Sequence, residues 1–360
     1  MILSGIILKA PYWIAWQACR LLRRQPDLVF YVDSLLDYQV MQNILPHLGR
    51  PSRIVARNGH VAAELRNLGL KPLRWPVFPK VVVMARHALH RFPIRRVKKI
   101  GLMHGPYFFK ELIRAERYNA FDRYLFSSPA ALEVARSRGI LSGVVGGYPR
   151  IDSFREPGLE DRGRELFERA GFDPRKKTLM LTGTWDRSHQ SAVHKWIGRT
   201  GLLQEKFNLL ASIHPMMSRE VKEKIRAIPG LVIAGQQDLY AWMTVTDYLV
   251  SDTSSIMAEF CVLDRPIITL MVDSGDRLTP AIRSMIADIS VQIGSLDGLD
   301  DALAQYVREP RLKQEARRRW TKVIFGDLSR SHGHLAAEAI SQCLERAGCS
   351  GTQRDKAAPS

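Results

Sequence analysis

Short apolar runs rich in β-branched residues alternate with helical patterns along most of the chain. Runs of this length, bounded by turn residues, are typical of buried strands, and their alternation with helices predicts parallel sheets covered by helices. The predicted strands are Leu28–Val32, Ser52–Arg57, Val81–Met84, Lys99–Met103, Arg123–Ser127, Ser142–Val145, Thr178–Thr182, Asn208–Ile213, Leu231–Ile233, Tyr248–Val250 and Ile267–Leu270. The predicted helices include Pro129–Arg138, His189–Thr200, Arg219–Ala227, Ser254–Leu263 and Asp297–Val307. We therefore expect an α/β protein.

A polar segment that contains Pro and Gly separates two groups of predicted strands near residues 152–175. A chain of 360 residues is long enough for two domains of ordinary size. We therefore expect two Rossmann-like lobes, formed by residues 1–155 and 170–345, and a disordered tail over 346–360. Neither lobe contains the Gly-x-Gly-x-x-Gly fingerprint, so no nicotinamide cofactor is predicted, and no other cofactor is indicated.

Positive charge is concentrated in the first hundred residues, which hold 17 Lys and Arg against 4 Asp and Glu, out of a net charge of +17 for the whole chain. Such a basic half indicates an anionic partner. No zinc-finger spacing, RNP-type aromatic run or helix-turn-helix accompanies the charge, so nucleic acid is not the expected partner. An anionic membrane surface is the preferred interpretation.

The N-terminal segment gives that interpretation limited support. Met1–Ala10 is apolar but too short to span a bilayer, and it lacks the basic start of a signal peptide. Aromatic, aliphatic and basic residues follow at helical spacing, namely Tyr12, Trp13, Ile14, Trp16, Leu21 and Leu22 with Arg20, Arg23 and Arg24. They suit either the headgroup layer or packing on their own domain. A second basic cluster, at Arg91, Arg95, Arg96, Lys98 and Lys99, either extends this face or is solvated.

A strand that ends in a small polar turn and leads directly into a helix lies at residues 248–260. Ser254 or Ser255 is expected to cap that helix, whose free N–H groups and positive dipole end would then form a site for phosphate. Glu259 lies one helical turn after Ser255, on the same face, where it could bind a ribose hydroxyl. An ordinary capped strand–turn–helix explains the same residues.

Ligands in open α/β sheets bind beyond the carboxyl ends of the strands, so the polar residues there are the candidates for a site. These strand ends carry His104-Gly105-Pro106, Gly146 to Asp152, Gly183-Thr184-Trp185, His214-Pro215 and Ser251 to Ser255. No metal site is predicted: His332-Gly333-His334 lacks a visible third ligand, and the cysteines (Cys19, Cys261, Cys343 and Cys349) lack ligand spacing. Free thiols without a secretion signal indicate the cytoplasm.

Taken in order, these strand ends resemble the CDP-glycerol glycerophosphotransferase family, the teichoic-acid primases and polymerases of the GT-B fold. The matching motifs are His104-Gly105, Gly147-Tyr148-Pro149-Arg150-Ile151-Asp152, Thr184-Trp185, His214-Pro215, Asp252-Thr253-Ser254-Ser255 with Glu259, and loosely Asp327 to Gly333. The likeness covers roughly residues 100–340. It implies two lobes that face each other across a cleft.

The sequence departs from the family pattern at four places around the expected donor and acceptor pockets. Glu259 replaces an Asp, Ser212-Ile213 replace a basic residue before His-Pro, Pro106 replaces a Thr, and Asp186 replaces a basic residue after Thr-Trp. These changes bear on the identity of the donor more than on the fold.

The resemblance implies transfer of glycerol phosphate, or a related polyol phosphate, from a CDP-activated donor to a hydroxyl of a glycan or lipid-linked acceptor, in the synthesis of a teichoic-acid-like or capsule polymer. His104 and His214 are then the catalytic residues, with His104 as the base and His214 at the diphosphate. The implied donor-binding residues are Thr184, Trp185, Asp252, Thr253, Ser254, Ser255, Glu259 and Arg150. The basic first lobe would dock on the inner face of the cell membrane.

Two other functions remain open. A GT-B glycosyltransferase that uses a nucleotide sugar fits the Ser-Ser turn and Glu259 almost as well, and a UDP-sugar epimerase is a weaker variant of that alternative. A non-catalytic protein that binds membranes or polyanions could also retain the scaffold, although the presence of both the His-Gly and His-Pro turns argues against it.

Overall fold

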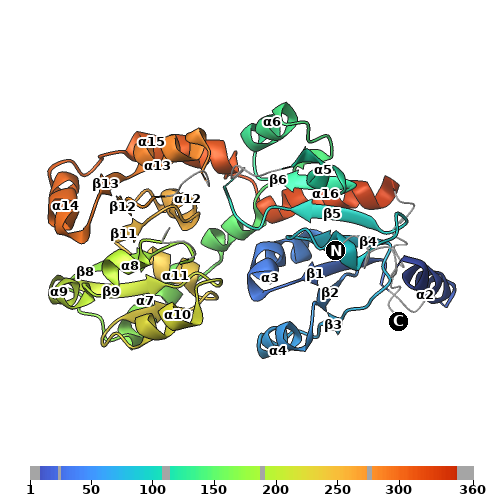
Figure 1. The fold of residues 1–360 in the computed structure, drawn as a ribbon, viewed down its shortest axis with the longest axis horizontal. Coiled ribbons are helices and arrows are strands. Elements are labelled where there is room, and N and C mark those ends of the chain that lie inside the picture. Colours follow the sequence, from blue (N-terminus) through green and yellow to red (C-terminus); the bar gives the residue numbers. More distant parts are fainter. Residues whose placement is uncertain (1–8, 23–25, 108–113, 187–190, 274–277, 347–360) are drawn as a thin grey trace, which may run out of the picture. The chain divides into compact units, whose positions relative to one another are not determined.

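The computed structural model describes residues 9–22, 26–107, 114–186, 191–273 and 278–346. These residues form two compact units. The first comprises residues 1–104, 114–152 and 325–360, and the second comprises residues 105–113 and 153–324. Figure 1 shows that each unit is built on one sheet with helices on both faces.

The sheet of the first unit is parallel throughout, with the strand order β3-β2-β1-β4-β5-β6-β7. Its strands are β1 (Leu28–Val32), β2 (Arg53–Ala56), β3 (Leu73–Arg74), β4 (Val81–Met84), β5 (Lys98–Leu102), β6 (Arg123–Phe126) and β7 (Gly143–Val145). Its helices are α2 (Lys9–Leu21), α3 (Leu35–Met41), η1 (Gln42–His47), α4 (Gly59–Asn67), η2 (Leu89–Arg91), α5 (Ala115–Asn119), α6 (Pro129–Ser137) and α16 (His332–Arg346).

The second sheet is also parallel and has the order β10-β9-β8-β11-β12-β13. Its strands are β8 (Lys177–Thr182), β9 (Phe207–Ser212), β10 (Val232–Ala234), β11 (Tyr248–Ser251), β12 (Ile267–Leu270) and β13 (Val291–Ile293). Its helices are α7 (Leu159–Arg169), α8 (Val193–Trp196), α9 (Thr200–Lys206), α10 (Arg219–Arg226), α11 (Leu239–Thr244), α12 (Ile256–Phe260), η5 (Cys261–Leu263), α13 (Pro280–Ile289), η7 (Leu296–Gly298), α14 (Leu299–Arg308) and α15 (Gln314–Phe325). The short helix η3 (Pro149–Arg155) contains the point at which the chain passes from the first unit to the second.

The predicted α/β class and the two Rossmann-like lobes are confirmed. All predicted strands are present, because their apolar runs are buried on both faces of the parallel sheets. Strands β3 and β13 were not predicted, since two or three residues are too few for a recognisable pattern. The predicted helix His189–Thr200 is wrong: α8 and α9 replace it with a break at Gly198, and residues 187–190 lie outside the described residues.

The predicted boundaries differ from the structure at two places. The segment expected to be a linker contains α7, which packs on α11 because Gly163 brings its backbone close to the carbonyl oxygen of Ala241. The end of the chain does not stay with the second lobe: α16 packs against η1, β6 and β7 of the first unit (Figure 1). The tail expected over 346–360 lies, beyond Arg346, outside the described residues.

Helix α2 packs one face on the first unit and exposes the other. The Tyr12 hydroxyl donates to the Val77 carbonyl at 2.7 Å, and Trp16 Nε1 donates to the Pro79 carbonyl at 2.7 Å. Trp13 and Ile14 are exposed, as are Leu21 and Leu22 at the end of the helix. Among the described residues, no helix has both the length and the apolar character needed to cross a bilayer.

Candidate functional site

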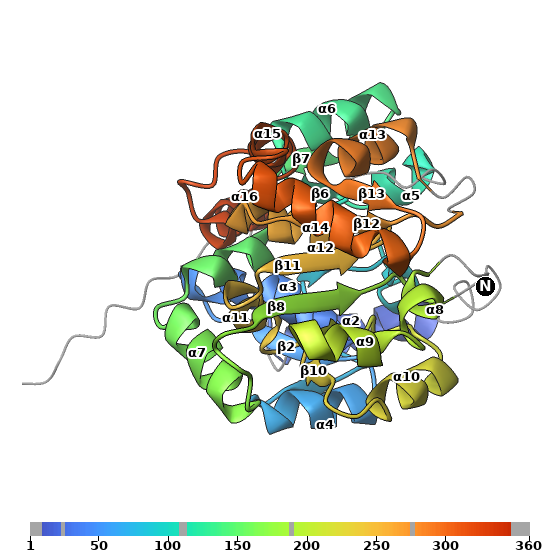
Figure 2. The ribbon, with the colours of Figure 1, turned by 90° about the vertical axis from the view of Figure 1, so that its left-hand side faces the viewer.

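The strand order of the second sheet reverses direction between β8 and β11, which makes their carboxyl ends the topological switch point (Figure 2). The two strand ends are joined directly, since the Thr182 hydroxyl donates to the Ser251 hydroxyl at 2.7 Å. Strand β9, which leads to His214, lies on the other side of β8. Three of the polar strand ends predicted from the sequence are therefore neighbours at one edge.

Asp252 joins the loops at this edge through hydrogen bonds from their backbone N–H groups. It is fully buried, and its carboxylate accepts the backbone N–H groups of Thr184 at 2.9 Å, Ala192 at 2.8 Å and Ser254 at 2.9 Å. Burial raises the pKa of the Asp252 carboxyl, and the backbone N–H groups act in the opposite direction. These hydrogen bonds to the backbone position the Ser254-Ser255 turn, and the predicted contact of Asp252 with the donor stays a prediction.

The expected capping of helix α12 is wrong in detail. Ser255 is the N-cap residue, but it has a helical conformation and its side chain makes no capping hydrogen bond. The reason is local: a capping side chain reaches the first N–H groups of a helix from an extended backbone, which Ser255 does not have. Thr253, Ser254 and Ser255 are half-buried, and the predicted binding of a phosphate at this turn stays a prediction.

Glu259 lies below the turn and is only 3% exposed. The Tyr240 hydroxyl, from α11, donates to Glu259 Oε1 at 3.0 Å, and the Tyr240 ring packs on Phe154 with centroids 4.4 Å apart. The carboxylate thus has a partner on α11. Its predicted contact with ribose stays a prediction.

Tyr107 contacts the same turn and was missed by the sequence analysis. Its hydroxyl donates to the Ser254 carbonyl at 2.9 Å, and burial, followed by the charges of Cys261, Asp252 and Glu259, raises its pKa well above the usual value. A Cβ at Gly105 would lie 3.6 Å from Ser255 Oγ.

The segment that carries Tyr107 follows His104 directly in the chain. An aromatic hydroxyl three residues after that histidine was the available signal. The contacts assign residues 105–107 to the second unit, whereas the whole His-Gly-Pro turn was expected in the first lobe.

His214 is half-buried at the end of β9, and its Nδ1 accepts the Met216 N–H group at 3.1 Å. A neutral imidazole that accepts at Nδ1 carries its proton on Nε2, so His214 presents an N–H donor there. In the neighbouring loop, Asp186 accepts the Ser218 N–H group at 2.7 Å. Burial acts to raise the pKa of Asp186, but the hydrogen bonds from Ser218 bring the pKa below its usual value.

Thr184 and Trp185 follow β8. Thr184 is buried, and its carbonyl accepts the Ser191 hydroxyl at 2.6 Å. Gly183 allows the close approach, since a Cβ there would lie 2.9 Å from Ser191 Oγ. The Thr-Trp loop is therefore fixed from both sides, by Asp252 and by Ser191, and the donor-binding role of its side chains stays a prediction.

The Gly147–Asp152 motif and the late Asp327–Gly333 segment meet in the first unit. Asp152 Oδ1 accepts the His332 N–H group at 3.0 Å, and Asp152 Oδ2 accepts the Gly333 N–H group at 2.7 Å and the Ser331 hydroxyl at 2.8 Å. His332 is buried, and its Nδ1 accepts the Tyr148 N–H group at 2.9 Å. These two motifs fasten α16 to the unit.

His104 and Arg150 differ in exposure. His104 is exposed beyond the end of β5, and its predicted role as the base stays a prediction. Arg150 is 7% exposed within η3, so its predicted contact with the donor stays a prediction. Among the described residues, no group of three His, Cys, Asp or Glu side chains could hold a metal ion.

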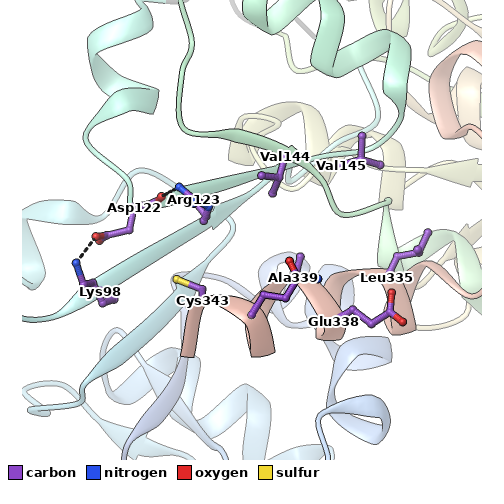
Figure 3. Close-up of a pocket in the computed structure, with 10 residues that line it drawn as sticks. Lys98, Asp122, Arg123, Val144, Val145, Leu335, Glu338, Ala339 and Cys343 are labelled. Carbon is purple, nitrogen blue, oxygen red and sulfur yellow. Dashed lines mark hydrogen bonds and ion pairs between the residues drawn. The ribbon is translucent and has the colours of Figure 1, made fainter. Parts of the chain in front are cut away.

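A pocket of about 260 Å³ lies in the first unit between α16 and strands β5 to β7 (Figure 3). Lys98 Nζ lies 2.8 Å from Asp122 Oδ1 at one end, and Cys343 and Glu338 line the pocket from α16. None of the site residues predicted from the sequence lines it. The strand ends, rather than this pocket, are therefore the candidate site.

A family model matches residues 114–289; the family is described as CDP-glycerol:poly(glycerophosphate) glycerophosphotransferase. The matched span contains Arg150, Thr184, His214 and the turn from Asp252 to Ser255, but not His104. No curated protein matches the sequence of the chain.

Solved structures match nearly the whole chain at low sequence identity. The wall teichoic acid polymerase TagF is 14% identical, with a TM-score of 0.66 over 94% of this chain and 98% of that chain. A TagF variant soaked with CDPG is 15% identical, with a TM-score of 0.65 over 94% and 99% of the two chains. The MnaA protein of S. aureus with UDP is 14% identical, with a TM-score of 0.61 over 91% and 98%. These matches confirm the predicted GT-B class.

Proposed function

We propose that the chain, which a model of the CDP-glycerol:poly(glycerophosphate) glycerophosphotransferase family matches over residues 114–289, transfers glycerol phosphate from CDP-glycerol to a hydroxyl of a membrane-associated, lipid-linked or glycan acceptor. The product would be part of a cell-surface polymer. The observation that carries this proposal is the family match over residues 114–289, which includes the turn fixed by Asp252 at the switch point of β8 and β11.

The proposed reaction is an in-line displacement at the phosphorus atom nearest the glycerol. The acceptor oxygen forms a new bond to phosphorus, the bond from phosphorus to the bridging oxygen breaks, and CMP leaves. His104 takes the proton of the acceptor hydroxyl as that oxygen attacks. No redox partner is needed, because the reaction exchanges one P–O bond for another.

The leaving phosphate gains negative charge, so donors fixed in advance at its position would stabilise the transition state. His214 supplies Nε2–H, because its Nδ1 accepts the Met216 N–H group. Ser254 and Ser255 supply hydroxyl groups from a turn that Asp252 and Tyr107 hold on two sides. Arg150, Thr184, Trp185, Thr253 and Glu259 complete the proposed donor site.

We propose that the protein works in the cytoplasm, on the inner face of the membrane, and docks through the exposed face of α2. Trp13, Ile14, Leu21 and Leu22 expose apolar surface there, while Tyr12 and Trp16 anchor the helix to the first unit. Apolar residues on a basic domain suit an anionic lipid surface.

Co-sedimentation with anionic vesicles tests this docking. Ile14→Glu should weaken vesicle binding several-fold, and Leu202→Glu, at an equally exposed position on α9, should not; the two side chains are 61% and 63% exposed. Equal losses in the two variants would exclude α2 as the docking face.

The experiment that tests the reaction measures CMP release from CDP-glycerol, CDP-ribitol and a panel of nucleotide sugars, with a membrane extract as the source of acceptor. CMP release from CDP-glycerol, lost in both His104→Ala and His214→Ala, is the expected result. Turnover of only a nucleotide sugar would replace the proposal with a glycosyltransferase.

A further inference from the structure

The first sheet has its own switch point, between β1 and β4, and the sequence analysis assigned no residue to it. Because β2 lies on the other side of β1, the residues after these three strands share one edge. They are Asp33 and Ser34 after β1, Arg57 after β2 and Arg86 after β4. Two arginines therefore flank the end of β1.

Arg86 is held in place by a buried carboxylate. Its Nε donates to Asp37 Oδ1 at 2.8 Å, and its Nη2 donates to the Ser34 hydroxyl at 3.3 Å. Asp37 Oδ2 accepts the N–H groups of Asp33 and Ser34, both at 3.0 Å. The Asp37 side chain is 1% exposed and the Arg86 side chain is 33% exposed. The Arg86 guanidinium is therefore held through Nε and Nη2, and part of the side chain is still accessible to a ligand.

Arg57 lies on the opposite side of the same strand end. Its N–H group donates to the Val32 carbonyl at 3.0 Å, and its Nη1 lies 3.2 Å from Asp33 Oδ2. Its side chain is 48% exposed. Asp33 contacts the Arg57 guanidinium through one carboxylate oxygen, and a guanidinium has five N–H donors, so further donors are available to a second anion.

Arg91 brings a third guanidinium to this edge. Its guanidinium carbon lies 4.6 Å from the centroid of the Trp75 ring, and Trp75 Nε1 donates to the Arg91 carbonyl at 3.2 Å. The Trp75 N–H group donates to the Ala56 carbonyl, which places Trp75 beside the end of β2. His90 lies close to the same charged groups. Burial lowers its pKa most, the charges of Arg91 and Arg57 also lower it, and the charge of Asp33 raises it.

The contacts described here thus bring three arginines and a histidine to this edge, against Asp33 and the buried Asp37. A neutral sugar hydroxyl would not require three guanidinium groups, whereas a phosphate group matches the donor geometry of arginine. We propose that Arg57, Arg86 and Arg91 bind a phosphate group of the acceptor, either in a polyol phosphate chain or in the diphosphate of a lipid-linked acceptor. This proposal rests on the proposed function.

Direct binding measurements test the site separately from the reaction. A short synthetic glycerol phosphate oligomer and a lipid-linked diphosphate in neutral vesicles serve as the two probes, one for each source of phosphate. The Arg57→Gln/Arg91→Gln variant should bind at least one of them roughly tenfold more weakly, as expected for the loss of a charge-assisted contact. Its affinity for CDP-glycerol should be unchanged.

Arg53→Gln is the matched control, because it removes the same charge from the amino end of the same strand, β2. Equal binding of both probes by the wild type and the double variant would overturn the proposal, as would an equal loss in Arg53→Gln. Unchanged binding of both probes together with weaker binding to vesicles of anionic lipid alone would assign the arginines to membrane docking, and would also overturn the proposal. Failure of the wild type to release CMP from CDP-glycerol would refute the proposed reaction but leave these binding results interpretable.

Discussion

We expect the substitution Gly333→Ala to weaken the packing of α16 on the rest of the first unit. A Cβ built there would lie 1.9 Å from the carbonyl oxygen of Asn43 and 2.7 Å from its carbon, whereas real Cβ atoms stay beyond 3.0 Å. Both are backbone atoms of η1, which cannot rotate away. In Gly333→Ala the two elements must therefore separate by about 1 Å.

The cost follows from what α16 would lose by moving. The Gly333 N–H group lies 2.7 Å from Asp152 Oδ2, so a shift of that size would break this hydrogen bond. A hydrogen bond to a charged group contributes about 1.5–3 kcal/mol, and overpacking costs about 1–3 kcal/mol. Gly333→Ala should lower the free energy of unfolding by about 4 kcal/mol.

Urea unfolding followed by circular dichroism measures this loss. Gly201→Ala is the matched control, since Gly201 also lies in a helix, α9, but has no atom within 4 Å of an added Cβ. That variant should be neutral or gain up to about 1 kcal/mol, because Ala favours the helix over Gly. If Gly333→Ala were no less stable than Gly201→Ala, the packing argument would be refuted.

Three further predictions concern the site and the response to pH. The amide nitrogen of Gln can take the place of His214 Nε2, whereas that of Asn cannot, so His214→Gln should preserve more activity than His214→Asn. In His214→Asn kcat should fall by about 10²-fold or more. Equal losses of activity in the two variants would contradict the assignment of the proton to Nε2. Tyr107→Phe removes the hydroxyl that donates to the Ser254 carbonyl, so KM for CDP-glycerol should rise about three- to tenfold. Tyr306→Phe loses a similar buried hydrogen bond, to the Ile267 carbonyl, and should leave KM unchanged. Burial lowers the pKa of Lys99 from 10.5 to about 8. Between these two pH values the unfolded chain binds more protons than the folded chain, so the free energy of unfolding should rise with pH, by at most about 1.4 kcal/mol per pH unit from this residue; urea unfolding of Lys99→Met should lack this slope.

Local sequence patterns were sufficient for the elements that are buried on both faces. Runs such as Val81–Met84 and Ile267–Leu270 are strands with the predicted bounds, because such runs end where polar residues meet solvent. The ends of strands β8, β9 and β11, which carry candidate site residues, were recognisable for the same reason. The partners of Tyr107 and Arg86 could not be predicted in this way, since they lie 147 and 49 residues away in the chain.

The sequence by itself determined the α/β class, the strand ends that are candidates for the site and the likeness to a phosphotransferase family, because these depend on apolar periodicity and on short motifs. Only the tertiary structure decided which strand ends are neighbours, since strand order is set by the packing of the whole sheet. It also decided that Asp252 serves the backbone of the Ser254-Ser255 turn, and that α16 returns to the first unit. Both outcomes depend on contacts between residues far apart in the chain, for which local sequence carries no signal.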